Sequence, residues 1–244
     1  MQMVILSGGL GTRLGELGRG RPKHLVDVLG TPFAHRQLRW LAESGVTDVV
    51  ECIGHLGDEI VASVGDGSAF GLSVTYSHDG TRPDGQPARP GTGGALALAR
   101  HRGLLNPRFM VIYGDSWLRM DLRAMWRQSA ESPLPATMAV LRNDGGREPS
   151  NVALDGELVR YRKGGDGDGL THIDYGVSTL SSRLLDGLDP GSDPNGSDLA
   201  DLMAQWSRDG RVAAYEVSEP YDEVGTPAGV ARLEAALLAT EQSG

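Results

Sequence analysis

The sequence predicts a three-layer α/β fold, in which helices cover both faces of a mixed, mostly parallel β-sheet. First, short apolar runs such as residues 3–6 and 109–113 are stopped by Ser7-Gly8-Gly9 and by Gly114, which is typical of buried strands. Second, residues 33–44 have the spacing of an amphipathic helix. Third, segments of the two kinds alternate through the first half of the chain, which favours a parallel sheet between helical layers.

The first half of the chain supplies most of this alternation. The helix at residues 33–44 is expected to begin after Thr31, with Pro32 at its first position, and to end at Gly45. Further strands are predicted at residues 25–28, 48–53 and 72–77, and further helices at residues 57–64 and 91–101. Residues 78–90 are rich in Gly, Pro, Asp and Arg and predict a surface loop.

Strand patterns dominate after residue 136. They fall at residues 136–141, 151–155, 158–161, 176–180 and 212–217. Helices are expected near residues 198–208 and 227–240. Because the chain has no internal repeat and no long linker, we expect one domain over residues 1–244.

Composition excludes several classes of protein. Apolar residues make up 39% of the chain, which argues against disorder, and no apolar run is long enough to span a membrane. Asp and Glu (32) outnumber Lys and Arg (23), so a nucleic-acid or membrane partner is not expected. The chain starts without the basic segment of a secretion signal, and its one cysteine, Cys52, suits a reducing cytoplasm.

The strongest local signal is a glycine-rich loop after the first strand, Leu6-Ser7-Gly8-Gly9-Leu10-Gly11-Thr12-Arg13-Leu14, followed by Pro22-Lys23. Glycines let backbone N–H groups approach an anion, and Arg13 and Lys23 add two cations. The spacing fits neither the dinucleotide fingerprint nor the Walker loop. The alternative is an ordinary glycine turn with two solvated charges.

This string resembles the signature of the sugar-1-phosphate nucleotidyltransferases, GGxGTRL followed by PK. Four later segments resemble further landmarks of that family in the same order: Gly91-Thr92-Gly93-Gly94-Ala95-Leu96, Tyr113-Gly114-Asp115-Ser116, Asp174-Tyr175-Gly176-Val177 and Glu223-Val224-Gly225-Thr226-Pro227. The resemblance is nearest to the short heptose-1-phosphate and mannose-1-phosphate guanylyltransferases. It implies a Rossmann-like nucleotidyltransferase fold, with residues 1–135 mainly binding nucleotide and residues 136–244 mainly binding sugar.

The resemblance also implies roles for individual residues. Arg13 and Lys23 would be catalytic, gripping the leaving phosphates and the α-phosphate. The nucleotide-binding residues would be Leu6, Gly8, Gly9, Gly11, Thr12, Gly93 and Gly94. The residues that bind the sugar or its phosphate would be Asn151, Lys163, Asp174 and Gly176. The family often has Glu before this lysine, whereas this chain has Arg162, a change that bears on sugar preference.

A magnesium site is expected from two carboxylates. Asp115 follows a buried strand, where a carboxylate can hold Mg²⁺ against nucleotide phosphates, although an aspartate there is also a common turn residue. Glu223 stands where the family usually has Asp. Asp222 is its rival, because neighbouring residues of a strand point to opposite faces. Alignment on Gly225-Thr226-Pro227 favours Glu223.

The predicted reaction joins a nucleoside triphosphate to a sugar 1-phosphate, heptose or hexose, and releases pyrophosphate. The resemblance favours GTP, without excluding the other four nucleotides. One alternative is a non-catalytic subunit that senses nucleotide or sugar. The other is a glycosyltransferase, which would normally need a D-x-D motif that Asp115-Ser116-Trp117 does not supply. The sequence leaves open whether the chain forms a homo-oligomer.

Overall fold

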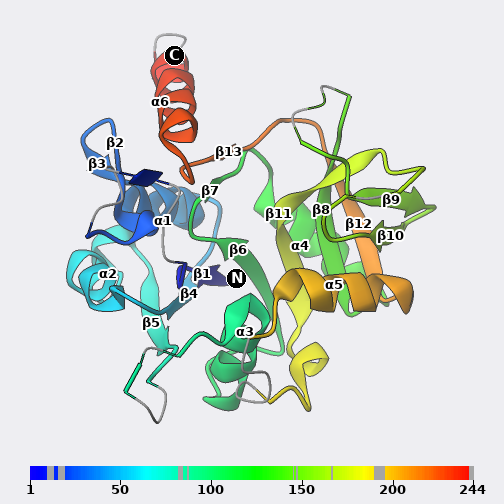
Figure 1. Cartoon of the computed structure of the whole chain (residues 1–244), viewed down its shortest axis with the longest axis horizontal. Helices are drawn as coiled ribbons and strands as arrows, with labels where there is room; N and C mark the ends of the chain where they lie inside the picture. Colours follow the sequence, from blue (N-terminus) through cyan, green and yellow to red (C-terminus); the bar gives the residue numbers. More distant parts are fainter. Residues whose placement is uncertain are drawn as a thin grey trace.

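The computed structural model describes residues 1–9, 14–15, 20–81, 85–86, 88–144, 146, 148–165, 167–189 and 196–241. Across these residues, nine strands form one mixed sheet in the order β5-β4-β1-β6-β11-β8-β12-β10-β9 (Figure 1). Their bounds are β1 Gln2–Leu6, β4 Asp48–Ile53, β5 Ser73–His78, β6 Arg108–Tyr113, β8 Ala136–Arg142, β9 Val152–Asp155, β10 Leu158–Tyr161, β11 His172–Ser181 and β12 Val212–Val217. The predicted α/β class is confirmed.

Helices bury both faces of the sheet. Helices α1 (Phe33–Glu43), α2 (Gly57–Val64) and α4 (Leu122–Glu131) pack on one face, and α3 (Gly91–His101) and α5 (Leu199–Arg208) on the other. Strand β1 shows why: Met3 and Ile5 lie in one core cluster, Val4 and Leu6 in the other. A strand that is apolar on both faces is typical of a central position in a parallel sheet.

The two halves of the sheet differ in whether their strands pair in parallel or antiparallel. Strands β5, β4, β1 and β6 are parallel to one another, as expected for strands joined by helical crossovers. Strand β11 is antiparallel to both β6 and β8, and antiparallel pairs also join β12, β10 and β9. Strand β11 thus carries a single sheet from the first half of the chain into the second.

Several elements differ from the sequence prediction. Residues 25–28 were predicted as one strand, but β2 covers only Asp27–Val28, because the N–H of Val26 donates to Lys23 O and closes a 3-10 turn before it. Helix α1 begins at Phe33, so Pro32 is its N-cap and not its first residue.

Strand β11 begins at His172 rather than at residue 176, because Gly176, with φ 89°, lies in a bulge inside the strand and not at its start. Helix α4 was not predicted. Its signal is Asp121, whose side chain accepts a hydrogen bond from the N–H of Ala124 and caps the helix.

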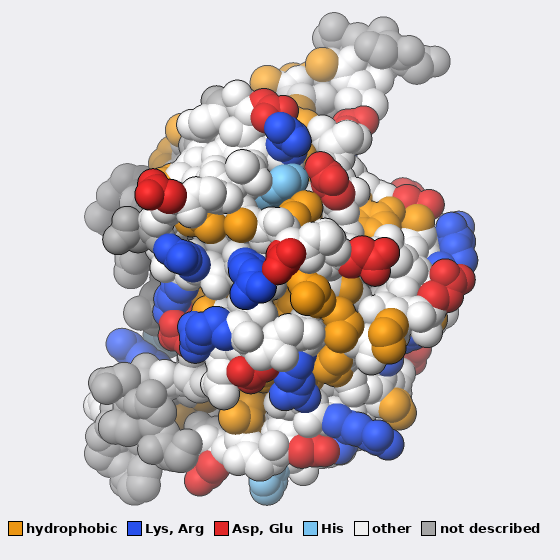
Figure 2. All heavy atoms as spheres, turned by 90° about the vertical axis from the view of Figure 1, so that its right-hand side faces the viewer, with side chains coloured by type: hydrophobic (Ala, Val, Ile, Leu, Met, Phe, Trp, Pro, Cys, Tyr) orange, Lys and Arg blue, Asp and Glu red, His pale blue; other side chains and the backbone are white. Residues whose placement is uncertain are grey.

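A third core cluster supports the last helix, α6 (Pro227–Glu241), which projects from the top of the molecule in Figure 1. Val230 and Leu233 of α6 pack with Val28 of the hairpin β2 (Asp27–Val28) and β3 (Thr31–Pro32). Among the described residues, no helix is long and apolar enough to cross a membrane. Acidic and basic side chains are interspersed on the face that Figure 2 shows.

Candidate active site

A cavity of about 580 Å³ opens where β1, β4, β5 and β6 end. The parallel pairing brings these carboxyl ends to one edge, which is where open α/β sheets bind ligands. Backbone hydrogen bonds fix the edge: the N–H of Ser7 donates to Cys52 O over 2.9 Å, and that of Gly114 to Leu6 O over 3.0 Å. The cavity has the size of a small-molecule site.

The glycine loop forms one wall of this cavity. Leu6, Gly8 and Gly9 line it, as the nucleotide-binding prediction requires, while Gly11, Thr12 and Arg13 lie outside the described residues. A Cβ at Gly8 would lie 3.0 Å from Asp79 Oδ2, so a side chain at this position would press on the Asp79 carboxylate.

Lys23 and Asp115 form an ion pair at the cavity wall. Lys23 begins the 3-10 helix η2 (Lys23–Leu25), and its Nζ donates to Asp115 Oδ2. Their side chains are only 16% and 17% exposed, so the pair is largely shielded from water. The tertiary structure therefore joins a predicted catalytic lysine to a predicted metal ligand.

The segment Glu223-Val224-Gly225, near the end of the chain, packs against this pair. The N–H of Val224 donates to Asp115 O over 2.9 Å, and a Cβ at Gly225 would lie 2.9 Å from Lys23 Nζ. A side chain at position 225 would therefore displace the end of the Lys23 side chain.

Asp222 and Glu223, the two candidates for the second metal ligand, contact different residues. Asp222 is buried, and its Oδ2 accepts from Arg119 Nη2 over 2.6 Å. Glu223 pairs with Ser116 in the small sheet formed by β13 (Asp222–Glu223) and β7 (Ser116–Trp117), next to Asp115. Asp222 is committed to Arg119, so Glu223 is the better candidate for a second ligand beside Asp115.

The predicted sugar-side residues Asn151, Asp174 and Gly176 are hydrogen-bonded to one another. Asn151 Oδ1 accepts from the N–H of Asp174 over 2.8 Å, and Asp174 Oδ1 from the N–H of Gly176 over 3.0 Å. Burial raises the pKa of Asp174 to about 6, against the lowering effect of the Gly176 N–H. The bulge in β11 thus presents a carboxylate that titrates near neutral pH.

Lys163 already has two carboxylate partners. Its Nζ lies 2.8 Å from Asp198 Oδ2 and 2.8 Å from Asp201 Oδ2, and these bonds raise its pKa. Asp198 also accepts from Thr92 Oγ1 over 2.8 Å, and Thr92 lines the cavity. Asp198 therefore links Lys163 to the cavity wall at Thr92, and a sugar phosphate bound by Lys163 would compete with both carboxylates.

Gly93 and Gly94 serve the packing of α3 against α5. Both N–H groups donate to Ser197 O, over 2.8 and 3.2 Å. A Cβ at Gly93 would lie 2.8 Å from Leu202 Cδ1. Their predicted contact with nucleotide stays a prediction, while their helix neighbours Thr92 and Ala95 line the cavity.

Comparison with known proteins identifies the family to which this chain belongs. The model of the family described as Nucleotidyl transferase matches residues 2–150, which is more than half of the chain. The chain belongs to this nucleotidyltransferase family. The resemblance drawn from the five motifs is thereby confirmed.

The nucleotidyltransferase also matches curated relatives along nearly its whole length. It is 30% identical to N-acetylmuramate alpha-1-phosphate uridylyltransferase of Neisseria meningitidis serogroup B, covering 93% of this chain and 94% of the relative. It is 26% identical to mannose-1-phosphate guanylyltransferase of Mycobacterium tuberculosis, covering 96% of this chain and 64% of the relative. Among solved structures, HddC from Yersinia pseudotuberculosis matches with a TM-score of 0.72 and 22% identity, over 97% of this chain and 99% of that chain.

Asp79 and Tyr113 line the cavity of the nucleotidyltransferase but were not among the site residues predicted from the sequence. Asp79 directly follows β5, and the strand-end argument that selected Asp115 would have found it. Burial raises its pKa to about 7, against the lowering effect of Arg102. Tyr113 ends β6, and burial raises its pKa well above the usual value, with Asp174, Asp198 and Asp115 adding to the shift. Tyr113 thus lies where nucleotide-side and sugar-side carboxylates converge.

Proposed function

We propose that this nucleotidyltransferase transfers GMP from GTP to a heptose or hexose 1-phosphate and releases pyrophosphate. The observation that carries the proposal is the shielded Lys23–Asp115 pair, which lies in the wall of the cavity together with Gly8 and Gly9 of the glycine loop. A cation and a carboxylate at one point suit a reaction in which two phosphates must be brought together.

In this reaction an oxygen of the sugar phosphate attacks the α-phosphorus of the nucleotide. The new P–O bond forms as the bond to pyrophosphate breaks, and pyrophosphate carries away the electron pair. A phosphate monoester, with a second pKa of about 6, is mostly dianionic at pH 7 and needs no general base. The protein's part is to hold both anions and to offset their charge, with Lys23 at the α-phosphate, Arg13 at the leaving group and Lys163 at the sugar phosphate.

Asp115 and Glu223 would hold Mg²⁺. The donor set fits, since Mg²⁺ is commonly bound by one or two carboxylates together with substrate phosphates and water. The shielded position of Asp115 and the pairing of Glu223 with Ser116 support this assignment. When bound, the ion would offset phosphate charge.

Asp79 supports the choice of GTP. Its carboxylate packs against Gly8 at the cavity wall. Guanine offers two adjacent donors, N1–H and the N2 amino group, to a carboxylate, whereas uracil and thymine offer a single N–H. The mannose-1-phosphate guanylyltransferase relatives agree with GTP, while the uridylyltransferase and thymidylyltransferase relatives make UTP and dTTP the alternatives to test.

The test is a pyrophosphate-release assay with Mg²⁺ that crosses five nucleoside triphosphates with mannose-, glucose-, heptose- and N-acetylmuramate 1-phosphates. Turnover with GTP and a heptose or hexose 1-phosphate is the expected result. Turnover only with UTP and N-acetylmuramate 1-phosphate would overturn both specificities but keep the reaction. Nucleotide binding without turnover on any pair would favour a sensing subunit.

Asp79→Asn tests the assignment of the base. An amide cannot accept both guanine donors, so the ratio of kcat/KM for GTP to that for UTP should fall about 10-fold or more, in line with one lost charge-assisted hydrogen bond. Asp155→Asn, which makes the same change at an exposed carboxylate on β9 and should leave the ratio unchanged, is the matched control. An unchanged ratio in Asp79→Asn would remove Asp79 from base recognition.

A further inference from the structure

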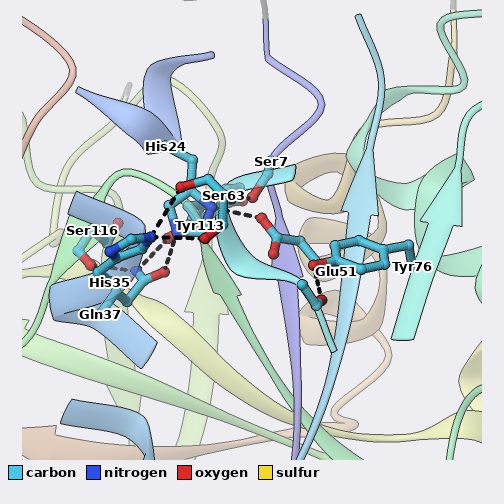
Figure 3. Close-up of polar contacts among 10 residues, drawn as sticks. Ser7, His24, His35, Gln37, Glu51, Ser63, Tyr76, Tyr113 and Ser116 are labelled. Atoms are coloured by element: carbon cyan, nitrogen blue, oxygen red, sulfur yellow. Dashed lines mark hydrogen bonds and ion pairs between the residues drawn. The ribbon is translucent and has the colours of Figure 1, made fainter. Parts of the chain in front are cut away.

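A chain of buried polar side chains lies directly behind the Lys23–Asp115 pair. His24 follows Lys23 in the sequence, and its side chain is 1% exposed. Gln37 of α1 and Glu51 of β4 are fully buried and contact the imidazole on its two sides (Figure 3). The reaction proposed above gives none of these three side chains a part.

Gln37 fixes the direction of the hydrogen bonds. Its Nε2 donates to Tyr113 O over 3.2 Å and to Ser116 O over 2.8 Å. Carbonyl oxygens only accept, so the amide cannot be reversed. Gln37 Oε1 must then accept from His24 Nε2, 2.9 Å away, and this ring nitrogen carries a proton.

Glu51 holds the other side of the ring. Its Oε1 lies 2.6 Å from His24 Nδ1, which is also 3.1 Å from Ser7 Oγ in the glycine loop. Glu51 Oε2 is buried and has no hydrogen-bond partner among the described residues. A buried carboxylate with one unpaired oxygen is costly to fold, so stability alone is a poor explanation for it.

The network spans both members of the ion pair. Gln37 binds the main chain at Tyr113 and Ser116, on either side of Asp115. His24 continues directly into Lys23. One rigid chain of hydrogen bonds thus connects the main chain that carries the carboxylate to the main chain that carries the lysine.

We infer that His24, Gln37 and Glu51 are positioning residues that fix Lys23 and Asp115 relative to each other. The inference rests on the proposed roles of Lys23 and Asp115 in phosphoryl transfer. Reacting groups must be held closely, and a displacement of about 1 Å can cost roughly 100-fold in rate. The network therefore governs turnover far more than it governs nucleotide affinity.

The test removes the amide group of Gln37 while keeping a side chain of similar length. Gln37→Met should lower kcat at least 10-fold, while the dissociation constant of GTP from calorimetry changes less than about threefold. Thr179→Val is the matched control, because Thr179 Oγ1 is also buried without a hydrogen-bond partner in the described part of the chain, but lies on β11 away from the network. It should change neither quantity.

Amide hydrogen exchange provides a second readout that needs no activity. The N–H groups of Gly114 and Val224 hold the segment around Asp115 through Leu6 O and Asp115 O. Their exchange should become about 10-fold faster in Gln37→Met and stay unchanged in Thr179→Val. Because exchange is measured without substrate, it tests the network even if no substrate pair gives turnover and the proposed function fails.

Three results would overturn the inference. The first is a folded Gln37→Met protein with unchanged kcat, and the second is unchanged exchange at Gly114 and Val224. The third is a proportional loss of GTP affinity and kcat, which would place the network in binding instead. If Gln37→Met does not fold, Gln37→Asn carries the same test, because its amide is one methylene too short to reach both carbonyls and His24.

Discussion

The Lys23–Asp115 pair joins two side chains that lie 92 positions apart in the sequence. Each charge offsets the other in a partly dehydrated place, where electrostatic interactions are stronger than in bulk water. Lys163 is also paired, with two carboxylates from the start of α5, but at a more exposed position. At the scale of the residue, the charges that the reaction needs are therefore held by partners before substrate arrives.

Asp115→Asn should lower kcat about 100-fold or more while the protein stays folded, because the amide keeps the shape of the side chain but loses the negative charge. Steady-state pyrophosphate release and thermal melting measure the two effects. Asp155→Asn, which removes an exposed carboxylate on β9, is the control and should leave kcat unchanged. Near-normal turnover in Asp115→Asn would exclude the assigned role.

Lys163 can be tested by removing its competitor. Asp201→Asn leaves Asp198 as the charged partner of Lys163, so the KM for the sugar 1-phosphate should fall, while Lys163→Met should raise it about 10-fold. The KM for the nucleotide should move little in either variant. If both variants raise the KM for sugar phosphate, the lysine acts through the Asp198–Asp201 contact and does not bind substrate.

The packing of α3 on α5 shows what glycine does at the scale of elements. Gly93 and Gly94 were chosen from the sequence as nucleotide contacts, yet their N–H groups and the space over Gly93 are taken by Ser197 and Leu202. The same contact places Thr92 at the cavity. A glycine motif can thus support a binding site by letting two elements approach each other.

Gly93→Ala should destabilise the protein by about 1–3 kcal/mol, because its Cβ would lie 2.8 Å from Leu202 Cδ1 and overpack the helix contact. Urea unfolding measures the change in the free energy of unfolding. Gly9→Ala is the control, since its Cβ would meet nothing within 4 Å. Equal stability of the two variants would mean that α5 gives way without cost.

In the part of the chain that the structure describes, two carboxyl groups resist ionisation at the pH where Asp normally ionises. Burial raises the pKa of Asp79 to about 7 and that of Asp174 to about 6, both above the usual value near 3.8. The folded state therefore binds these protons more tightly than the unfolded state does. Their contribution to stability is fully present below about pH 4 and is lost as the pH rises through the folded pKa values.

Asp79→Asn should consequently stabilise the protein relative to the wild type at pH 8 but not at pH 4. The gain is expected on the order of 2 kcal/mol, since Asp79 is half-buried and the full shift must be discounted for solvent. Urea unfolding at pH 4, 6 and 8 measures it. A difference that does not depend on pH would show that the raised pKa does not contribute to stability.

The sequence by itself determined the fold class, most helices and strands, and the family. These features follow from local patterns: the apolar runs of β1 and β6, the spacing of α1, and five short motifs in order. It also brought Lys23 and Asp115 forward as candidates, because a strand end and a PK motif can be read without knowledge of contacts.

Only the tertiary structure decided how those candidates are used. It committed Asp222 to Arg119, gave Lys163 two carboxylate partners, and placed Gly176 in a bulge within β11. It also assembled His24, Gln37 and Glu51, three residues that no motif singles out. The physical reason is that hydrogen bonds and ion pairs depend on distances of a few ångströms between residues far apart in the chain, and only the packing of the strands and helices sets those distances.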